Sequence, residues 1–168
     1  MKHDFYNKYS YKIKSIQEVT KKIKSITGRK KIILCHGVFD IVHPGHVRHF
    51  SYAKSKADIL VVSLTTDKYI KKGTYRPHVP EKLRALNLAA FEMVDFVVID
   101  NEATPLKNLK ILKPDFFAKG FEYSSDNISK ETLEEMDVVK SYGGKMIFTP
   151  GDVVYSSSKI ISTTLPNI

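Results

Sequence analysis

Short apolar runs alternate along this chain with longer segments in which apolar residues recur every three or four positions. The short runs lack polar alternation, which is typical of strands buried on both faces of a sheet. The longer segments have the spacing of helices that bury one face. This alternation predicts an α/β fold with a parallel five-stranded sheet and helices on both faces. The predicted strands are 31–35, 58–64, 94–99, 115–120 and 145–149.

Several predicted helices carry clear end signals. Ser15-Ile16-Gln17-Glu18 is a capping box that begins a helix, and Gly28 ends it. A second helix begins near Pro44 or Gly45, because proline suits the first helical position. The remaining helices are predicted at 80–93 (with Leu83, Leu86, Ala90 and Met93 facing inward), 104–112, 129–142 and, capped by Ser156, at the C-terminal end.

The length of 168 residues fits one domain, which we expect at residues 29–161. It is preceded by residues 1–28, a basic segment whose first 14 residues are predicted to be loosely ordered and whose helix packs on the domain. Residues 162–168 form a tail. The single cysteine, Cys35, excludes an intrachain disulfide and, with no signal peptide, favours a cytoplasmic location.

The net charge of +9 is concentrated at the N-terminus. Residues 1–31 contain ten Lys or Arg against Asp4 and Glu18, a balance of +8, which leaves +1 for the rest of the chain. The basic stretch lacks the aromatic interleaving of a nucleic-acid-binding module, and a solvated helix face explains it. No apolar run reaches the length of a membrane span. We therefore expect neither a nucleic-acid partner nor a membrane partner.

Candidate chemistry is concentrated between His36 and Phe50, where a predicted strand leads through a loop into a helix. His43 and His46 are three positions apart at the helix start, where N–H groups and the helix dipole favour anions such as polyphosphate. A metal cluster that adds His49 is disfavoured, because no Cys or carboxylate stands at ligand spacing. His49 is interpreted as a surface histidine. The stretch thus predicts a phosphate site without a protein-bound metal.

Gly37-Val38-Phe39-Asp40 followed by His43-Pro44-Gly45-His46 resembles the signature of the cytidylyltransferase-like nucleotidyltransferases. These Rossmann-like enzymes join a nucleoside monophosphate from CTP or ATP to a phosphorylated alcohol and release pyrophosphate. The His-x-Gly-His element also occurs in class I tRNA synthetases and pantetheine-phosphate adenylyltransferases, so it indicates the superfamily and not the substrate.

The resemblance extends over residues 30–161 through Lys72-Gly73-x-x-Arg76-Pro77, Arg84, Val94-Asp95, Thr104-Pro105 and Lys119-Gly120-Phe121-Glu122-Tyr123. This succession is most similar to the nucleotidyltransferase domain of ADP-heptose synthase, which adenylylates a heptose 1-phosphate. It is less similar to glycerol-3-phosphate cytidylyltransferase. Cytidylyltransferases usually carry Arg-Thr-Glu-Gly-Ile-Ser-Thr-Thr before the last helix, whereas Gly151 to Ser158 contain no arginine. Relatives are often fused to a sugar kinase, which implies that this chain is fused or coupled to one.

The resemblance implies a role for each matching residue. Lys72 would swing over the α-phosphate from the predicted loop 65–80. Arg84 would make a bidentate phosphate contact, the alternative being a surface ion pair with Glu81. The implied catalytic residues are His43, His46, Lys72 and Arg84; the nucleotide-binding residues are Gly37, Val38, Phe39, Asp40, Gly45, Lys119, Gly120, Ser156, Ser157 and Ser158; the substrate-binding residues are Asp40, Arg76, Glu122 and Tyr123.

The resulting prediction is a nucleotidyltransferase that acts on a sugar or polyol phosphate, with ATP favoured over CTP and Mg²⁺ held by the nucleotide phosphates. The alternatives are a glycerol-3-phosphate-type cytidylyltransferase and a nucleotide-binding regulatory module without turnover. The stretch from Phe91 to Asp95 matches a region in which relatives form two-fold dimers. A homodimer is therefore expected.

Overall fold

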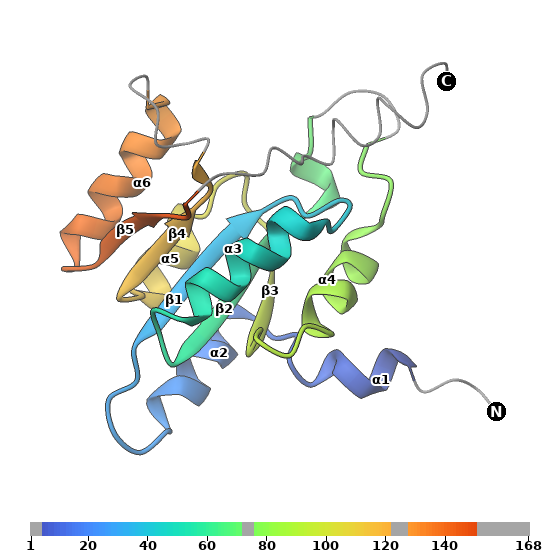
Figure 1. The fold of residues 1–168 in the computed structure, drawn as a ribbon, viewed down its shortest axis with the longest axis horizontal. Coiled ribbons are helices and arrows are strands. Elements are labelled where there is room, and N and C mark those ends of the chain that lie inside the picture. Colours follow the sequence, from blue (N-terminus) through green and yellow to red (C-terminus); the bar gives the residue numbers. More distant parts are fainter. Residues whose placement is uncertain (1–4, 72–75, 122–127, 151–168) are drawn as a thin grey trace.

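The computed structural model describes residues 5–71, 76–121 and 128–150 (Figure 1). Five strands form one all-parallel sheet in the order β3-β2-β1-β4-β5. The predicted fold class, a Rossmann-like parallel sheet with helices on both faces, is confirmed. The strands are β1 (Ile32–Gly37), β2 (Ile59–Thr65), β3 (Phe96–Asp100), β4 (Phe116–Lys119) and β5 (Lys145–Phe148).

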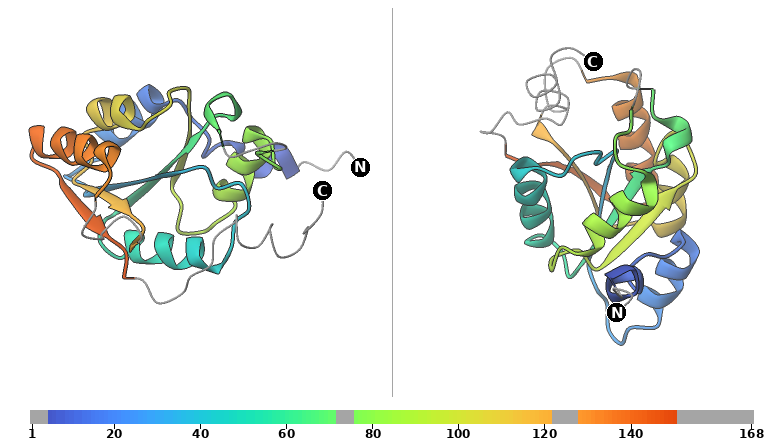
Figure 2. Two further views of the ribbon diagram at one scale, coloured as in Figure 1. Left: turned by 90° about the horizontal axis from the view of Figure 1, so that it is seen from above. Right: turned by 90° about the vertical axis from the view of Figure 1, so that its right-hand side faces the viewer.

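Helices cover the two faces of the sheet in separate groups. Helices α3 (Pro44–Lys54) and α4 (Glu81–Ala89) pack on one face, over a core that includes Phe50 and Leu88. Helices α2 (Ile16–Lys24), α5 (Leu106–Leu112) and α6 (Lys130–Ser141) pack on the other. Figure 2 shows α3 on the opposite side of the sheet from α2, α5 and α6. A single 3-10 turn, η1 (Asp67–Tyr69), follows β2.

The starts of α2, α3 and α6 confirm the predicted caps there, whereas α2 ends at Lys24 and not at Gly28. Ser15 and Glu18 form the reciprocal capping box of α2, Pro44 occupies the first turn of α3, and the Ser129 hydroxyl accepts from the Thr132 N–H at the start of α6. Such caps satisfy main-chain donors that have no partner within the helix. None of the helices in the described ranges is long and apolar enough to cross a bilayer.

Residues 5–14 differ from the prediction of a loosely ordered N-terminal segment. Residues Phe5–Ser10 form helix α1, and the chain then runs beside β3. Val97 donates its N–H to the Lys12 carbonyl and accepts the Lys14 N–H, both at 3.0 Å. Because β3 is an edge strand, its outer N–H and C=O groups need partners, and this segment supplies them.

The region from 80 to 99 also differs from the prediction. Helix α4 ends at Ala89 instead of residue 93, and β3 begins at Phe96 instead of residue 94. Leu83 is 37% exposed, whereas Arg84 is fully buried. Apolarity alone assigned the inward face, but an arginine that finds several acceptors can take that face instead.

Candidate functional site

The candidate site lies at the carboxyl end of β1, in the middle of the sheet. The chain runs from β1 outward through β2 to β3, and then returns to place β4 and β5 on the other side of β1. The reversal between β1 and β4 is the place where open α/β sheets bind ligands. The predicted phosphate-binding stretch follows β1 directly, so the topology places it at this position.

The turn after β1 depends on Gly37 and Phe39. Phe39 has a positive φ of 52°, and its ring folds back over Gly37. A Cβ at residue 37 would lie 3.0 Å from the Phe39 Cζ atom, so a larger residue would displace the ring. The ring is buried against His46, with centroids 5.2 Å apart, and against Phe50 at 5.4 Å. Phe39 therefore supports the turn from the core with a buried ring.

His43 and His46 come together as predicted. His43 precedes the first residue of α3 and is buried, and His46 lies in the first turn. Their ring centroids are 3.8 Å apart, and the His43 N–H donates to His46 Nδ1 at 3.3 Å. Because Nδ1 of His46 is an acceptor, the neutral ring carries its proton on Nε2. His46 is thereby held as a donor at the start of α3.

The structure modifies one expectation about this helix start. The N–H groups of His46 and Val47 both bond to the His43 carbonyl. Pro44 has no N–H group. The N–H groups expected to favour an anion are therefore partly used within the helix start, and the imidazoles of His43 and His46 are the side-chain donors expected there.

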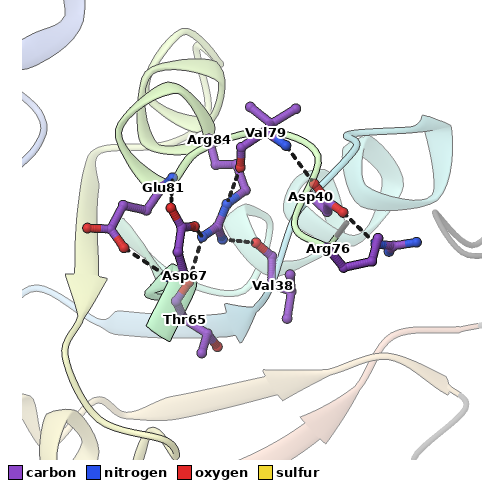
Figure 3. Close-up of polar contacts among 8 residues, drawn as sticks. All are labelled: Val38, Asp40, Thr65, Asp67, Arg76, Val79, Glu81 and Arg84. Atoms are coloured by element: carbon purple, nitrogen blue, oxygen red, sulfur yellow. Dashed lines mark hydrogen bonds and ion pairs between the residues drawn. The ribbon is translucent and has the colours of Figure 1, made fainter. Parts of the chain in front are cut away.

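Arg84 is a buried connector between loops, and neither predicted contact describes it (Figure 3). Its guanidinium donates to the carbonyls of Val38, Thr65 and Val79 and pairs with Asp67 at 2.6 Å. The Asp67 carboxylate in turn accepts from the Glu81 N–H, whereas Glu81 accepts from the Asp67 N–H. The surface ion pair with Glu81 is therefore wrong, and the phosphate contact does not fit a guanidinium so enclosed. Arg84 holds the ends of β1 and β2 against the start of α4.

Asp40 and Arg76, both predicted to bind substrate, pair with each other (Figure 3). Arg76 Nε lies 2.7 Å from the Asp40 carboxylate, and both side chains are largely buried. The other Asp40 oxygen accepts from the Val79 N–H at 3.0 Å. The pair fastens the loop before α4 to the turn after β1, beside the Arg84 contacts.

Lys119 ends β4, and Gly120 follows it. The Lys119 ammonium donates to the Thr132 hydroxyl and pairs with Glu135, which is itself buried. Burial raises the pKa of Glu135 despite the neighbouring charge. In this conformation Lys119 fixes the start of α6 to β4, so its charge is neutralised at the edge of the site. Lys72, Glu122, Tyr123, Ser156, Ser157 and Ser158 lie outside the described residues.

A buried polar cluster that the sequence analysis did not identify lies at the strand ends. His36 Nδ1 contacts the Ser63 hydroxyl at 3.1 Å, and His36 Nε2 contacts the Thr65 hydroxyl at 3.3 Å. Ser63 also contacts Asp100 and Asn108. Burial, and then the charge of Lys119, lower the pKa of His36 to about 4, so the ring is neutral near pH 7. Burial raises the pKa of Asp100 to about 6.

His49 was interpreted as a surface histidine, and this is wrong. Its Nδ1 contacts the hydroxyl of Thr149, which donates to the Lys119 carbonyl at 3.2 Å. Because the single hydroxyl proton goes to that carbonyl, His49 Nδ1 is the donor. Burial lowers the pKa of His49 to about 4. The residue thus joins α3 to the ends of β4 and β5.

Known proteins share both the sequence and the fold. The bifunctional protein HldE of Gluconobacter oxydans is 43% identical over 119 residues, 70% of this chain and 24% of that protein. HldE of Campylobacter jejuni serotype O:2 is 45% identical over 117 residues, 68% of this chain and 25% of that protein. The chain therefore spans about a quarter of these relatives.

Among solved structures, the lipopolysaccharide core biosynthesis protein from Thermoplasma volcanium has a TM-score of 0.62 at 23% identity. It covers 74% of this chain and 100% of its own. The pantoate-beta-alanine ligase from Francisella tularensis, with a TM-score of 0.59 at 18% identity, covers 84% of this chain and 67% of its own. These two likenesses concern the fold. The family described as cytidylyltransferase-like matches residues 34–163, so this chain belongs to that family and is a nucleotidyltransferase.

Proposed function

We propose that this chain transfers a nucleoside monophosphate from ATP or CTP to the phosphate of a sugar or polyol phosphate. A phosphate oxygen of the acceptor attacks the α-phosphorus, the bond from that phosphorus to the bridging oxygen breaks, and pyrophosphate leaves with the bond electrons. The products are an activated nucleotide-sugar, or its polyol equivalent, and pyrophosphate. The chemistry requires positioning and charge neutralisation more than covalent help from the protein.

The observation that carries the proposal is the contact between His43 and His46 at the start of α3. Two imidazoles whose centroids lie 3.8 Å apart stand at the ligand-binding end of β1. There they can donate to a triphosphate and stabilise the charge that develops on the leaving pyrophosphate. Arg84 and Asp40 contribute indirectly, because their contacts fix the turn that carries His43. Lys72 is proposed to approach the α-phosphate from its loop.

Mg²⁺ is proposed to be held by the nucleotide phosphates. In residues 5–71, 76–121 and 128–150 no three His, Cys, Asp or Glu side chains gather as metal ligands. The proposal rests on the preference of Mg²⁺ for water and phosphate oxygens over an all-protein cage. When bound, Mg²⁺ would neutralise phosphate charge, while the histidines hold the triphosphate in place.

The preference for ATP and for a sugar acceptor rests on the resemblance of the motifs in this chain to the nucleotidyltransferase domain of ADP-heptose synthase. We also propose that the chain works in sequence with a sugar kinase, because a kinase produces the phosphorylated acceptor that this reaction consumes. We also propose that the chain forms a homodimer.

A pyrophosphate-release screen tests the function. ATP and CTP are each combined with Mg²⁺ and a panel of sugar and polyol phosphates, and His46→Ala serves as the matched control. We expect release with at least one pair, ATP giving the higher rate, and a strong loss in the control. Nucleotide binding without release for any pair would instead support a regulatory module that lacks turnover.

A further inference from the structure

The polar cluster at the strand ends is unusual for the sheet face on which it lies. Residues of a strand alternate between faces, and Leu34 belongs to the core beneath α2, α5 and α6. His36, two positions later, therefore points to the same face, as does Ser63, which contacts Asn108 of α5. The opposite face remains apolar at this level, with Phe39, Val62 and Leu64. Burying polar groups costs free energy unless they are paired, so a polar cluster in one place needs a reason.

The geometry of the proposed reaction gives that reason. In an in-line displacement, the attacking oxygen and the leaving pyrophosphate lie on opposite sides of the phosphorus. His43 and His46 belong to the side of the sheet that α3 covers, so pyrophosphate would leave there. The acceptor then approaches from the other side of the β1 end. The polar side chains of His36 and Thr65 stand on that side.

We propose that His36 and Thr65 recognise hydroxyl groups of the phosphorylated acceptor and so help to determine which acceptor is used; this inference rests on the proposed function. The side chain of His36 retains 12% exposure, whereas that of Asp100 behind it retains 2%. His36 therefore reaches the surface while Ser63 and Asp100 orient it from inside. Its Nε2 contacts the Thr65 hydroxyl at a long 3.3 Å, a contact that a ligand hydroxyl can replace or extend.

The charge of the cluster fits hydroxyl groups better than phosphate. The low pKa of His36 keeps its imidazole neutral, and the ammonium of Lys119 is paired with Glu135. Asp100 contributes a negative charge that would repel an anion. A neutral ring and a hydroxyl, each able to donate and accept, are suited to the polyhydroxylated part of a sugar or polyol. The acceptor phosphate would then lie at the α-phosphorus, opposite the leaving pyrophosphate, with its sugar or polyol part toward this cluster.

The test measures equilibrium binding by titration calorimetry, with mannose 1-phosphate, glycerol 3-phosphate and inorganic phosphate as probes. Thr65→Val removes the hydroxyl and keeps the shape, and His36→Gln keeps a polar group in altered geometry. Thr20→Val, which removes a hydroxyl from α2, is the matched control. We expect the wild type to bind at least one organic phosphate more tightly than inorganic phosphate. Each site variant should weaken that binding about tenfold and leave binding of inorganic phosphate and ATP unchanged.

Organic phosphates that bind the wild type no more tightly than inorganic phosphate would overturn the inference. Variants that bind them as the wild type does would also overturn it. If His36→Gln does not fold by circular dichroism, Thr65→Val decides the question alone. Pyrophosphate release is measured separately, so a chain that binds a sugar phosphate through Thr65 but releases no pyrophosphate would refute the proposed function and not the acceptor site.

Discussion

His46 and Arg84 are both basic side chains beside the end of β1, but their surroundings give them different roles. His46 is partly exposed and stands at a helix start, whereas Arg84 is enclosed and bonded to main-chain carbonyls. A partly exposed donor can bind a ligand, whereas an enclosed donor can only stabilise the structure around the site. The two residues should therefore respond differently to substitution.

For the histidines, we predict that His43→Ala and His46→Ala each lower turnover at least about a hundredfold, the scale of losing one preorganised donor to developing charge. Steady-state pyrophosphate release measures this. His46→Ala should leave the urea midpoint near that of the wild type, since the ring is partly exposed. Turnover within a few-fold of the wild type would remove the pair from the mechanism.

For the buried arginine, we predict that Arg84→Met lowers the free energy of unfolding by about 3–5 kcal/mol, because three carbonyls and Asp67 lose their partner inside the protein. Urea unfolding followed by circular dichroism measures the loss. Lys107→Met is the matched control, since its ion pair with Glu102 is exposed, and it should change stability far less than Arg84→Met does. Equal effects of the two variants would contradict the connecting role of Arg84.

At the scale of elements, α3 is joined to the far half of the sheet through His49 and Thr149. The fold keeps the pKa of His49 at about 4, below the value of about 6.5 expected for the unfolded chain. Between these pH values His49 takes up a proton in the unfolded chain but not in the folded one. The free energy of unfolding therefore falls as the pH falls. The lowered pKa of His36 also reduces stability as the pH falls, whereas the raised pKa of Asp100 increases it. These two effects partly offset one another.

We therefore predict that the wild type loses stability between pH 7.5 and pH 5, and that His49→Gln loses less over the same interval. The difference should be at most about 2 kcal/mol. Urea unfolding at both pH values, with both chains in one buffer series, measures it. Parallel declines in the two chains would show that His49 is not the titrating group.

Elements whose signals are local could be predicted from the sequence. The capping box of α2 lies within four residues, and each buried strand is a run of neighbouring apolar side chains. The site was predicted only in part, because its contacts join distant positions. His49 meets Thr149 across 100 residues, and Arg84 reaches Val38 across 46. Only the strand order places His36 beside Thr65, so no local pattern marks their cluster.

At the scale of the whole molecule, assembly remains a prediction. The stretch that suggested a dimer is partly used by the monomer, since Phe91 and Met93 pack against the core beneath α3 and α4. The outer edge of β3 is also covered, by residues 12–14, so a pairing of β3 edges is disfavoured. A dimer would instead use the partly exposed sides of Phe91 and Met93.

We predict a homodimer of the full chain at micromolar concentration. Sedimentation equilibrium measures the mass, and a species of 19.1 kDa at that concentration would contradict the prediction. Deletion of residues 1–14 is not a neutral control, because it would uncover the β3 edge. Loss of stability in that deletion would follow from the fold and would say nothing about assembly.

The way Arg84 makes its contacts bears on how such a protein changes over evolutionary time. Three of its acceptors are main-chain carbonyls, and every amino acid brings one. Mutations at Val38, Thr65 or Val79 can therefore alter the side chain and leave the bond to Arg84 in place. Thr65 has two roles. Its carbonyl accepts a hydrogen bond from Arg84, and its hydroxyl contacts His36 in the proposed acceptor site. A lineage could drift from one acceptor to another at this position while the architecture that supports the chemistry is inherited intact.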